Sequence, residues 1–444
     1  MDHSVETRVE TGRLARKAVP RRTHLYEPGE RTFDPIALIE QQNEGRIPEL
    51  VPIRHARMAQ SAFAFYRGSA AVMAADLAAR PHSGIIVQLC GDAHLSNFGA
   101  FGSPERTLLL DINDFDETLH GPFEWDVKRL VASAVLAARD RGFGPQMARN
   151  AALAAADSYA ESMREYAGMR ELDIWYSRIS ANEILSLLPR GRWRRAYRAG
   201  VAKAQERDNL RALNRLAEPY DGGLRIKDQL PLIKRVEVPD ELRRVKGFLD
   251  AYRDTLEESR RNLLDRYSFV SAAYKAVGVG SVGTFCFIGL FLGRDNDDPL
   301  FLQVKQANAS VLEAYLPPSP YEQHGERVVT GQRLMQAASD VFLGWAKGEG
   351  GRHFYVRQLW DWKASIDVAR LDPQRLMLFS QFCGRILARA HARTGDAVAI
   401  ASYIGGSDRF SEVLTRFATA YADQAERDHE SFSEAIVAGR LSIA

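Results

Sequence analysis

Cysteine is scarce in this chain of 444 residues, which contains only Cys90, Cys286 and Cys383. These cysteines lie far apart and lack metal-ligand spacing, so neither a disulfide framework nor a zinc site is expected. Long apolar runs are also missing, because the best candidate, Phe285–Leu292, is too short to cross a bilayer. The N-terminal segment carries charges where a signal peptide needs an apolar stretch. We therefore expect a soluble cytoplasmic protein without a membrane partner.

An excess of charge of either sign is missing too, since 59 Lys and Arg residues face 57 Asp and Glu residues. The net charge of +2 gives no reason to expect nucleic acid as a partner. One basic segment, Arg190–Lys203, could bind an acidic substrate or RNA, with Trp193 available for stacking. Such a run is more often the solvated face of a helix. The length and the ordinary globular composition predict two or three domains.

A G-x-x-x-x-G-K-[ST] loop is absent, and no Ser-His-Asp or Cys-His arrangement is legible. The chain has instead a G-x-G-x-x-G segment, in which Gly278, Gly280, Ser281 and Gly283 could bind phosphates. A dinucleotide-binding fold needs a helix directly after such glycines. The following TFCFIGLFLG is typical of a strand, which favours a kinase-type loop whose backbone amides close over phosphates. An ordinary hairpin is the alternative.

Lys305 lies at the end of PLFLQVK, a predicted strand with apolar residues on both faces. A lysine there, under the glycine segment, could reach the phosphates of ATP. The alternative is a strand-end lysine that extends to water. A phosphate-binding lysine usually needs a carboxylate to fix it, and Glu313, Glu322 and Glu326 are candidates. Glu313 is favoured because it lies in the apolar SVLEAY.

The densest group of polar side chains lies in CGDAHLSNFGAFGSPERTLLLDINDFD, at 90–116, between predicted strands at 84–90 and 106–112. An acid, an amide and a second acid at strand ends can hold Mg²⁺ and orient a hydroxyl toward a phosphate. The alternative is a turn capped by Asp92 with a solvent-facing His94. That alternative does not explain the Asp–Asn pair between two buried strands.

Each polar side chain of this segment receives a predicted role. Asp92 accepts the proton of the substrate hydroxyl, and His94 orients the loop. Asn97 and Asp114 hold Mg²⁺, and Asp116 is either a second metal ligand or a turn residue. Further along, Trp125-Asp126 begins a predicted helix at 124–142, and its acid is interpreted as support for the catalytic loop.

These residues resemble the aminoglycoside and choline kinase branch of the protein-kinase-like superfamily. That branch shows H-G-D-x-H-x-x-N, then an I-D-F strand end and a W-D helix start. The matching positions are Gly91, Asp92, His94, Asn97, Asp114 and Asp126, while Cys90 replaces the first histidine. The resemblance implies a phosphotransferase that uses ATP and Mg²⁺ to modify a hydroxyl or amine of a small molecule. An AMP transferase on the same scaffold and a non-catalytic nucleotide-binding module are the alternatives.

From LVPIRHARM to LARAHARTGD the chain is also similar to the bacterial family called domain of unknown function 2252, which implies a kinase-like fold. In ordinary kinases the glycine loop and lysine precede the catalytic loop, whereas here they follow it. A circular permutation would account for this order. A dimer in which the two halves meet between subunits is the competing explanation. The predicted fold class is α+β: a two-lobed protein-kinase-like fold, circularly permuted, with a helical insertion.

The predicted organisation has five parts. They are an N-terminal arm at 1–50 with a short helix near Pro35–Glu44, a catalytic-loop part of the large lobe at 51–144, a helical subdomain at 145–265, a β-rich nucleotide-covering lobe at 266–365, and C-terminal helices at 366–444 that complete the large lobe. Within this scheme a helix at 376–394 packs under the catalytic loop. Backbone groups near Leu359–Trp362 are expected to hold adenine.

Overall fold

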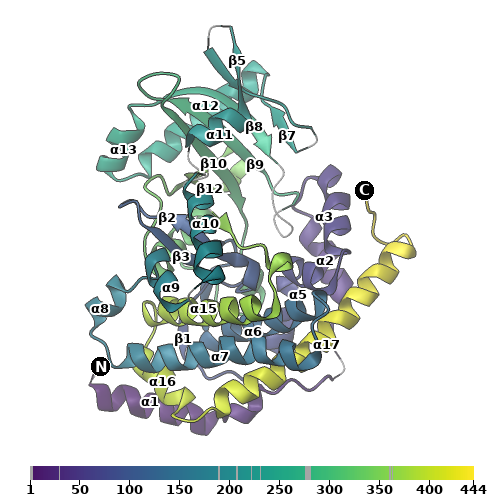
Figure 1. Cartoon of the computed structure of the whole chain (residues 1–444). Helices are drawn as coiled ribbons and strands as arrows, with labels where there is room; N and C mark the ends of the chain where they lie inside the picture. The colour runs from purple at the N-terminus through teal and green to yellow at the C-terminus, as the bar shows by residue number, and fades with distance from the viewer. Residues whose placement is uncertain are drawn as a thin grey trace.

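A computed structural model describes residues 4–444 except 30, 189–190, 207–208, 222, 231, 276–281, 360–361 and 363. The fold is mixed α+β. Figure 1 shows a six-stranded sheet with its own small helices at one end of the molecule and a larger, mainly helical body at the other. Among the described residues, no helix is both long enough and apolar enough to cross a membrane.

The six-stranded sheet is antiparallel throughout and has the order β11-β12-β10-β9-β8-β7. Its strands are β7 (Ile233–Arg235), β8 (Ser268–Lys275), β9 (Cys286–Leu292), β10 (Pro299–Ala307), β11 (Gly344–Lys347) and β12 (His353–Gln358). Helix α12 (Pro239–Asp254) covers one face through Phe248 and Tyr252, and helix α11 (Asn209–Leu216) covers part of the other face. The sheet is therefore buried on both sides around β10, its most central long strand.

Alternation along β10 decides where Lys305 points. Leu300, Leu302 and Val304 pack with α12, whereas Phe301 packs on the opposite face with α11. Successive side chains of a strand point to opposite faces, so Lys305 shares the face of Phe301. Lys305 is also not the last residue of its strand, because pairing with β12 continues to Ala307.

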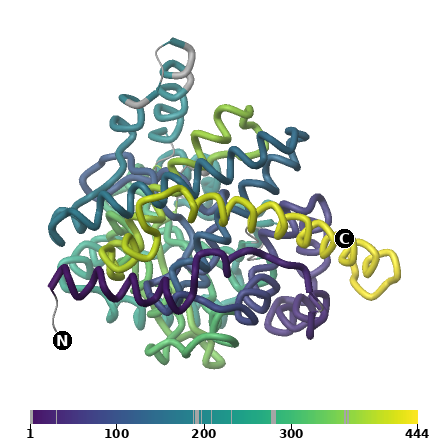
Figure 2. Tube along the Cα trace, turned by 90° about the horizontal axis from the view of Figure 1, so that it is seen from below, coloured from purple at the N-terminus to yellow at the C-terminus, as the bar shows by residue number. Residues whose placement is uncertain are grey.

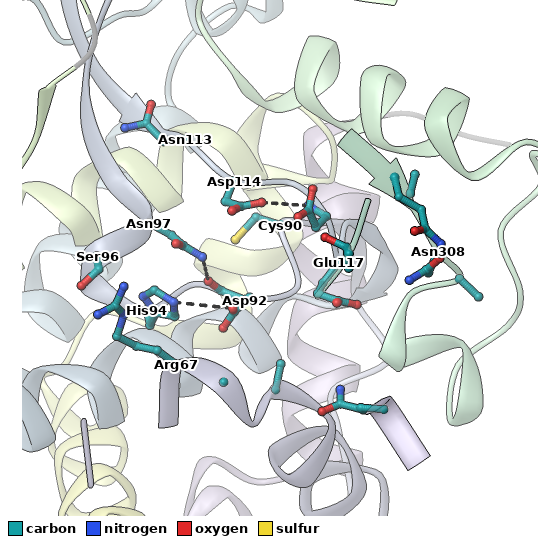
Figure 3. Close-up of a pocket in the computed structure, with 18 of the residues that line it drawn as sticks. Arg67, Cys90, Asp92, His94, Ser96, Asn97, Asn113, Asp114, Glu117 and Asn308 are labelled. Atoms are coloured by element: carbon teal, nitrogen blue, oxygen red, sulfur yellow. Dashed lines mark hydrogen bonds and ion pairs between the residues drawn. The ribbon is translucent and has the colours of Figure 1, made fainter. Parts of the chain in front are cut away.

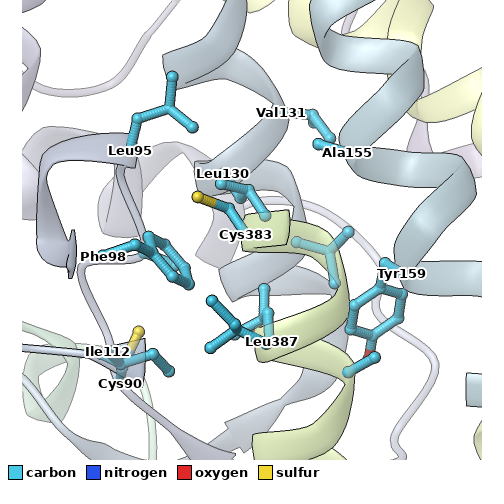
Figure 4. Close-up of a cluster of buried hydrophobic side chains, with 14 of the residues drawn as sticks. Cys90, Leu95, Phe98, Ile112, Leu130, Val131, Ala155, Tyr159, Cys383 and Leu387 are labelled. Atoms are coloured by element: carbon cyan, nitrogen blue, oxygen red, sulfur yellow. The ribbon is translucent and has the colours of Figure 1, made fainter. Parts of the chain in front are cut away.

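The helical body is built around α6 (Phe123–Asp140), α7 (Pro145–Ala167), α15 (Pro373–Ala392) and α17 (Arg409–Val437). Helix α7 presents a face of small buried residues, and a Cβ added to Gly384 of α15 would lie 2.2 Å from the carbonyl oxygen of Ala155. The two helices therefore approach each other closely. In Figure 4, Cys383 and Leu387 point from α15 toward Leu130 of α6, Phe98 and Ile112.

The other strands of the described residues form three small antiparallel sheets. They are β1 (Ile86–Leu89) with β4 (Leu119–Pro122), β13 (Ala364–Ser365) with β2 (Phe98–Gly102) and β3 (Leu108–Ile112), and β5 (Ala217–Tyr220) with β6 (Gly223–Ile226). The strands expected at 84–90 and 106–112 are β1 and β3, but they belong to different sheets. The segment between them does not form a single loop, because it contains the 3-10 turn Leu95–Asn97 and strand β2.

The remaining helices are α1 (Val5–Ala18), α2 (Pro35–Asn43), α3 (Val51–Met58), α4 (Ala62–Gly68), α5 (Ala70–Ala78), α8 (Glu171–Tyr176), α9 (Ala181–Leu187), α10 (Arg192–Gln205), α13 (Glu258–Leu264), α14 (His324–Met335) and α16 (Ala397–Ile404). The short helix expected near Pro35–Glu44 is confirmed as α2. The basic segment Arg190–Lys203 falls largely on α10.

The helical spacing of apolar residues predicts one helix at 63–79 and another at 326–345, and both predictions were wrong. The apolar run at 63–79 is not one helix, because Ser69 leaves the helical region with φ −122° and ψ 41° and separates α4 from α5. The helix expected at 326–345 ends at Met335. The side chain of Asp340 accepts hydrogen bonds from the backbone N–H groups of Phe342 and Gln358, which directs the chain into β11 instead.

The N-terminal segment is packed along its length rather than extended as an arm. Helix α1 lies on α16, where Arg8 forms an ion pair with Asp396 at 2.9 Å. The ring of Tyr26 meets the rings of Phe417 and Tyr421 of α17 edge-on. Figure 2 shows the two ends of the chain running together across the helical body. Both ends therefore contribute to one structural unit.

Candidate active site

A cleft of about 300 Å³ lies where the six-stranded sheet meets the segment at 90–117. Figure 3 shows that Asp92, His94, Asn97 and Asp114 point into one region of it. The sheet side contributes residues after β10 and Arg357 of β12. The structure thus brings together polar side chains that the sequence separates widely.

The backbone of the loop that carries Asp92 depends on a glycine. Gly91 has φ +83°, and a Cβ at this position would lie 2.1 Å from the carbonyl oxygen of Glu117. Only glycine adopts this conformation without strain and leaves room for the neighbouring strand end. The backbone N–H groups of Cys90 and Gly91 donate to Asp126 Oδ2 and Oδ1 at 2.7 and 3.0 Å. The prediction that Asp126 supports the loop is therefore confirmed.

Asp126 is itself held from the C-terminal half of the chain. His391 Nε2 lies 3.3 Å from Asp126 Oδ2, and His391 Nδ1 lies 2.8 Å from the hydroxyl of Tyr159. His391 is fully buried. Helix α15 therefore packs under the loop, as the sequence predicted. The role of His391 was missed, because no residue spacing links it to Asp126.

A second buried contact fixes α15 against β3. Arg389 donates to Asp111 Oδ1 and Oδ2 at 2.6 and 2.8 Å, and both side chains are 1% exposed. Asp111 also accepts from the backbone N–H of Ala337 at 2.9 Å. Asp111 is thus a buried structural residue, and it keeps α14, α15 and β3 in place beside the cleft.

The two carboxylate oxygens of Asp92 differ in their contacts: Oδ1 accepts a hydrogen bond from an arginine, whereas the contact of Oδ2 with His94 is longer. Arg129 of α6 donates to Asp92 Oδ1 at 2.7 Å, and Asn97 Nδ2 donates to the Asp92 carbonyl oxygen at 2.8 Å. Burial raises the pKa of Asp92, while the adjacent Arg129 opposes the rise. The Asp92 side chain remains 19% exposed, so a small molecule in the cleft can reach it.

His94 does not face solvent, which rules out the alternative of a surface turn. His94 is 3% exposed, and its Nε2 lies 3.5 Å from Asp92 Oδ2. Burial, together with the charges of Arg67 and Arg129, holds the pKa of His94 well below its usual range. A neutral imidazole beside Asp92 can orient the loop, in keeping with its predicted role.

One backbone hydrogen bond joins Asn97 to Asn113, the residue before Asp114. The carbonyl oxygen of Asn97 accepts from the N–H of Asn113 at 2.8 Å, which brings the segment after β3 alongside the 3-10 turn. Burial and then the charge of Asp116 raise the pKa of Asp114, and Lys305 opposes the rise. Both residues line the cleft.

Their oxygen atoms suit Mg²⁺, which takes one or two carboxylates and completes its shell with water and phosphates. Within the described ranges, no group of three or more His, Cys, Asp and Glu side chains is arranged to hold a metal by itself. The donor set of Asn97 and Asp114 therefore fits a cation that arrives with a nucleotide better than a resident metal ion.

Lys305 is fixed by Asp116 rather than by Glu313. Its Nζ lies 2.7 Å from Asp116 Oδ2, and Asp116 Oδ1 accepts from the hydroxyl of Tyr355 at 2.7 Å. Burial disfavours the charge of Lys305, but Asp114 and Asp116 outweigh it and raise the pKa of the lysine. Burial would raise the pKa of Asp116, but Lys305 and Tyr355 lower it. Both oxygens of Asp116 are thus used inside the protein, a role that neither predicted option described.

Glu313 serves the local backbone instead. It accepts from the N–H of Ser310 at 3.1 Å and forms a capping box for the 3-10 turn Val311–Ala314. Its Oε1 lies 3.8 Å from Arg327 Nε. Nearness in sequence favoured Glu313 as the partner of Lys305, but the cap turns its carboxylate toward Ser310.

Arg327 joins the sheet side of the cleft to the acidic segment. From α14 it donates to the carbonyl oxygens of Thr118, Asp116 and Asn308 at 2.6, 2.8 and 2.8 Å. The side chain is 2% exposed. Nothing in the sequence marked this residue, because its three acceptors are backbone groups.

The predicted glycine segment is only partly described. Gly278, Gly280 and Ser281 lie outside the described residues, as do Trp360 and Asp361 of the expected adenine-binding segment. Gly283 has φ +90°, and its carbonyl oxygen accepts from the N–H of Ile47 at 2.7 Å. Arg46 donates to the carbonyl oxygen of Val282 at 2.6 Å. The N-terminal segment thus contacts the end of the glycine segment, and Arg46 lines the cleft.

Comparison with known proteins adds one relationship. No curated protein and no solved structure matches the chain. The family described as "Uncharacterized protein conserved in bacteria (DUF2252)" matches residues 46–435, a range that includes both the loop of Asp92 and the strand of Lys305. The chain therefore belongs to this bacterial family.

Proposed function

We propose that this protein is a phosphotransferase that uses ATP and Mg²⁺, with a circularly permuted kinase-like fold, and that it modifies a hydroxyl or amine of a small molecule. The observation that carries the proposal is the contact between Lys305 and Asp116. It joins Lys305 of β10, a strand that follows the glycine segment, to Asp116, which lines the same cleft as Asp92 and Asp114; the lysine itself is buried beside that cleft. Kinase chemistry needs a lysine, a metal-binding acid and a base in one cleft.

The order of elements around Lys305 supports a kinase-like small lobe. In protein kinases a glycine-rich loop covers the phosphates, the lysine lies on the third strand and a helix follows. Here β8, the glycine segment, β9, β10 with Lys305, α14 and the hairpin β11–β12 follow one another. One feature departs from that pattern, because the carboxylate that fixes the lysine comes from Asp116 and not from the helix.

The packing of the chain ends supports the permutation. Helix α15 lies under the loop of Asp92, and the N-terminal segment lies on α16 and α17. One lobe is therefore assembled from both ends of the chain, while the sheet is inserted between them. Since Lys305 and Asp116 meet within one chain, the cleft needs no second subunit to be complete.

The groups in the cleft are arranged for in-line transfer. Arg129 holds one oxygen of Asp92, which leaves Oδ2 to accept the proton of the acceptor. The acceptor oxygen or nitrogen bonds to the γ-phosphorus while the bond to the bridging oxygen breaks, and ADP leaves with that electron pair. Lys305 has three N–H donors, so it can bind phosphate oxygens while one proton stays on Asp116. Asn97 and Asp114 would hold Mg²⁺, which neutralises phosphate charge.

Labelled ATP tests the reaction. The full-length protein is incubated with Mg²⁺, a bacterial metabolite extract and ATP labelled at either the γ or the α position. Label from the γ position on a metabolite is the expected result. Label from the α position would mean AMP transfer and would overturn the proposal.

Two variants and a binding measurement control that assay. Asp92→Asn should lower turnover by roughly 100- to 10,000-fold, the usual contribution of a general base. Asp297→Asn, an exposed turn residue, should behave as wild type. A non-hydrolysable ATP analogue with Mg²⁺, at about 100 times its dissociation constant, should stabilise all three proteins by roughly 2.7 kcal/mol. No thermal shift of the wild type at millimolar analogue would contradict the proposal.

A further inference from the structure

Arg67 is a cation in the cleft that the mechanism does not use. It lies in the last turn of α4 and lines the cleft with Asp92, His94 and Ser96. Its Nε is buried without a hydrogen-bond partner, and its side chain forms no hydrogen bond or ion pair with any residue that the structure describes. Its guanidinium only rests near the ring of Phe63, at 5.9 Å from the centroid. The other arginines nearby are bound: Arg129 by Asp92 and Arg327 by three carbonyl oxygens.

Arg67 is half-buried, and its Nε is shielded from solvent. Burial lowers the pKa of Arg67, and the charge of Asp92 opposes the effect. Among the described residues, Asp92 forms its ion pair with Arg129 and none with Arg67. A half-buried charge without an opposite charge beside it is stabilised by a ligand that supplies one. The position therefore favours an anionic ligand.

The location of Arg67 separates it from the nucleotide side. In Figure 3 its guanidinium lies beside His94 and Ser96, on the far side of Asp92 from Glu117 and Asn308. Asn308 follows β10, the strand of Lys305, so the phosphates of ATP would enter from that side. The group that receives the phosphoryl must approach Asp92 from the other side, where Arg67 lies.

We infer that the acceptor is an anion, a hydroxyl or amine compound that also carries a carboxylate or phosphate group, and that Arg67 binds this group with Ser96 as a second donor. The inference rests on the proposed function. The planar guanidinium binds carboxylate and phosphate in a bidentate manner, which orients the acceptor as well as holding it. A cationic acceptor, such as those of the aminoglycoside and choline kinases, would be repelled by Arg67 and would find the carboxylate of Asp92 already neutralised by Arg129.

Inorganic phosphate is a direct probe of the Arg67 site. Its binding to the full-length protein without nucleotide is measured by calorimetry for the wild type, Arg67→Gln, Lys305→Ala and Arg294→Gln. Arg294 is an exposed arginine in the turn after β9 and serves as the matched control. Arg67→Gln should bind phosphate at least about tenfold more weakly, because hydrogen bonds between charged partners are the stronger kind. Arg294→Gln should bind it as the wild type does, and Lys305→Ala should lose less affinity than Arg67→Gln.

Either of two results would overturn the inference: no phosphate binding by the wild type, or binding that Lys305→Ala abolishes and Arg67→Gln spares. The second would mean that phosphate binds only on the nucleotide side. Because the measurement contains no nucleotide, it is independent of whether the protein binds ATP. A protein that shifts with the ATP analogue but not with phosphate would retain the proposed function and lose this acceptor class.

Four small hydroxyl compounds test the charge of the acceptor itself. Glycerol, choline, glycerate and glycerol 3-phosphate are added to the protein saturated with Mg²⁺ and the ATP analogue. Glycerate and glycerol 3-phosphate should raise the melting temperature of the wild type further, and Arg67→Gln should lose this added shift while keeping the shift with nucleotide. A shift with choline in place of the anions would overturn the inference. So would a loss of the nucleotide shift in Arg67→Gln, since Arg67 would then bind the γ-phosphate.

Discussion

Lys305 Nζ lies 2.7 Å from Asp116 Oδ2, although 189 residues separate the two in the sequence. The lysine is 3% exposed and the carboxylate 28% exposed. The contact joins the six-stranded sheet to the acidic end of β3, and the hydroxyl of Tyr355 completes it from β12. The two sides of the cleft are thus connected by charge.

Removing both partners of this pair should cost less stability than the sum of the two single removals. We expect Lys305→Met and Asp116→Asn each to lower the free energy of unfolding by about 1–3 kcal/mol, because each leaves a buried polar group unsatisfied. The double variant should lose less than the sum. Urea titration of the four proteins measures the coupling. The exposed pair Arg253–Asp265 is the control and should show a coupling of roughly 0–1 kcal/mol. Additive losses at Lys305 and Asp116 would show that the contact contributes nothing.

The same pair predicts a pH dependence. The pKa of Asp116 is lowered in the folded protein, so its stabilisation is present above its unfolded pKa of about 3.9 and is lost as the pH falls through the folded value. The pKa of Lys305 is raised, so its contribution is complete below about pH 10.4 and is lost only as the pH rises through its folded value.

The stability difference between wild type and Asp116→Asn should therefore be constant from about pH 5 to 10 and should shrink below about pH 4. Neighbouring Asp114, Tyr355 and Arg357 face the pair; the raised pKa of Tyr355 keeps its hydroxyl protonated over this range. Urea titrations at several pH values measure the difference. A difference that grows as the pH falls would contradict the assigned ion pair.

Two glycines with positive φ allow the cost of backbone strain to be separated from the cost of a steric clash by an added Cβ. Gly91 has φ +83°, and a Cβ there would collide with the carbonyl of Glu117; Gly142 has φ +68° and open space around it. Gly142→Ala should cost about 1–2 kcal/mol, the price of the left-handed conformation alone. Gly91→Ala should cost clearly more and should abolish turnover, because the loop of Asp92 must move. Equal losses of stability in the two variants would show that the loop absorbs the extra carbon.

Asp126 should matter for turnover without touching the reacting groups. Asp126→Asn keeps the shape of the side chain but replaces one of the oxygens that accept from Cys90 and Gly91 with a donor. We expect a loss of about 1–3 kcal/mol in stability and a lower kcat with an unchanged dissociation constant for nucleotide. Asp140→Asn, at the exposed end of the same helix, is the control. A change in nucleotide affinity with kcat intact would contradict this positioning role.

Local patterns predicted much of the site. The motif around Asp92, the start of α6 at Phe123 and the support from Asp126 could be read from residue types and spacing, because turns, caps and strand ends depend on near neighbours. The strand of Lys305 was also readable, since a short apolar run after a turn is typical of a strand buried on both faces. The break at Ser69 and the early end of α14 were not, because contacts of single polar groups decide them.

Partners across the cleft were beyond the reach of these patterns. Glu313 was favoured for Lys305 because it is close in sequence, yet its carboxylate caps a turn while Asp116 approaches from the opposite side of the cleft. Arg67, Arg327 and His391 carried no recognisable spacing. Arg327 and His391 act through groups that belong to another part of the chain, and Arg67 meets the other residues of the cleft only in the folded structure.

The sequence by itself determined which side chains could take part in chemistry, the strands and helices that bear most of them, and the membership of a bacterial family. The tertiary structure alone decided that Asp116 binds Lys305, that α15 supports the loop through His391, and that Arg67 forms no ion pair with the cleft residues that the structure describes. The physical reason is the distance along the chain over which each interaction acts. Backbone preferences and hydrophobic periodicity act over a few residues, whereas an ion pair depends on the final distance between two atoms, which the packing of the whole chain sets.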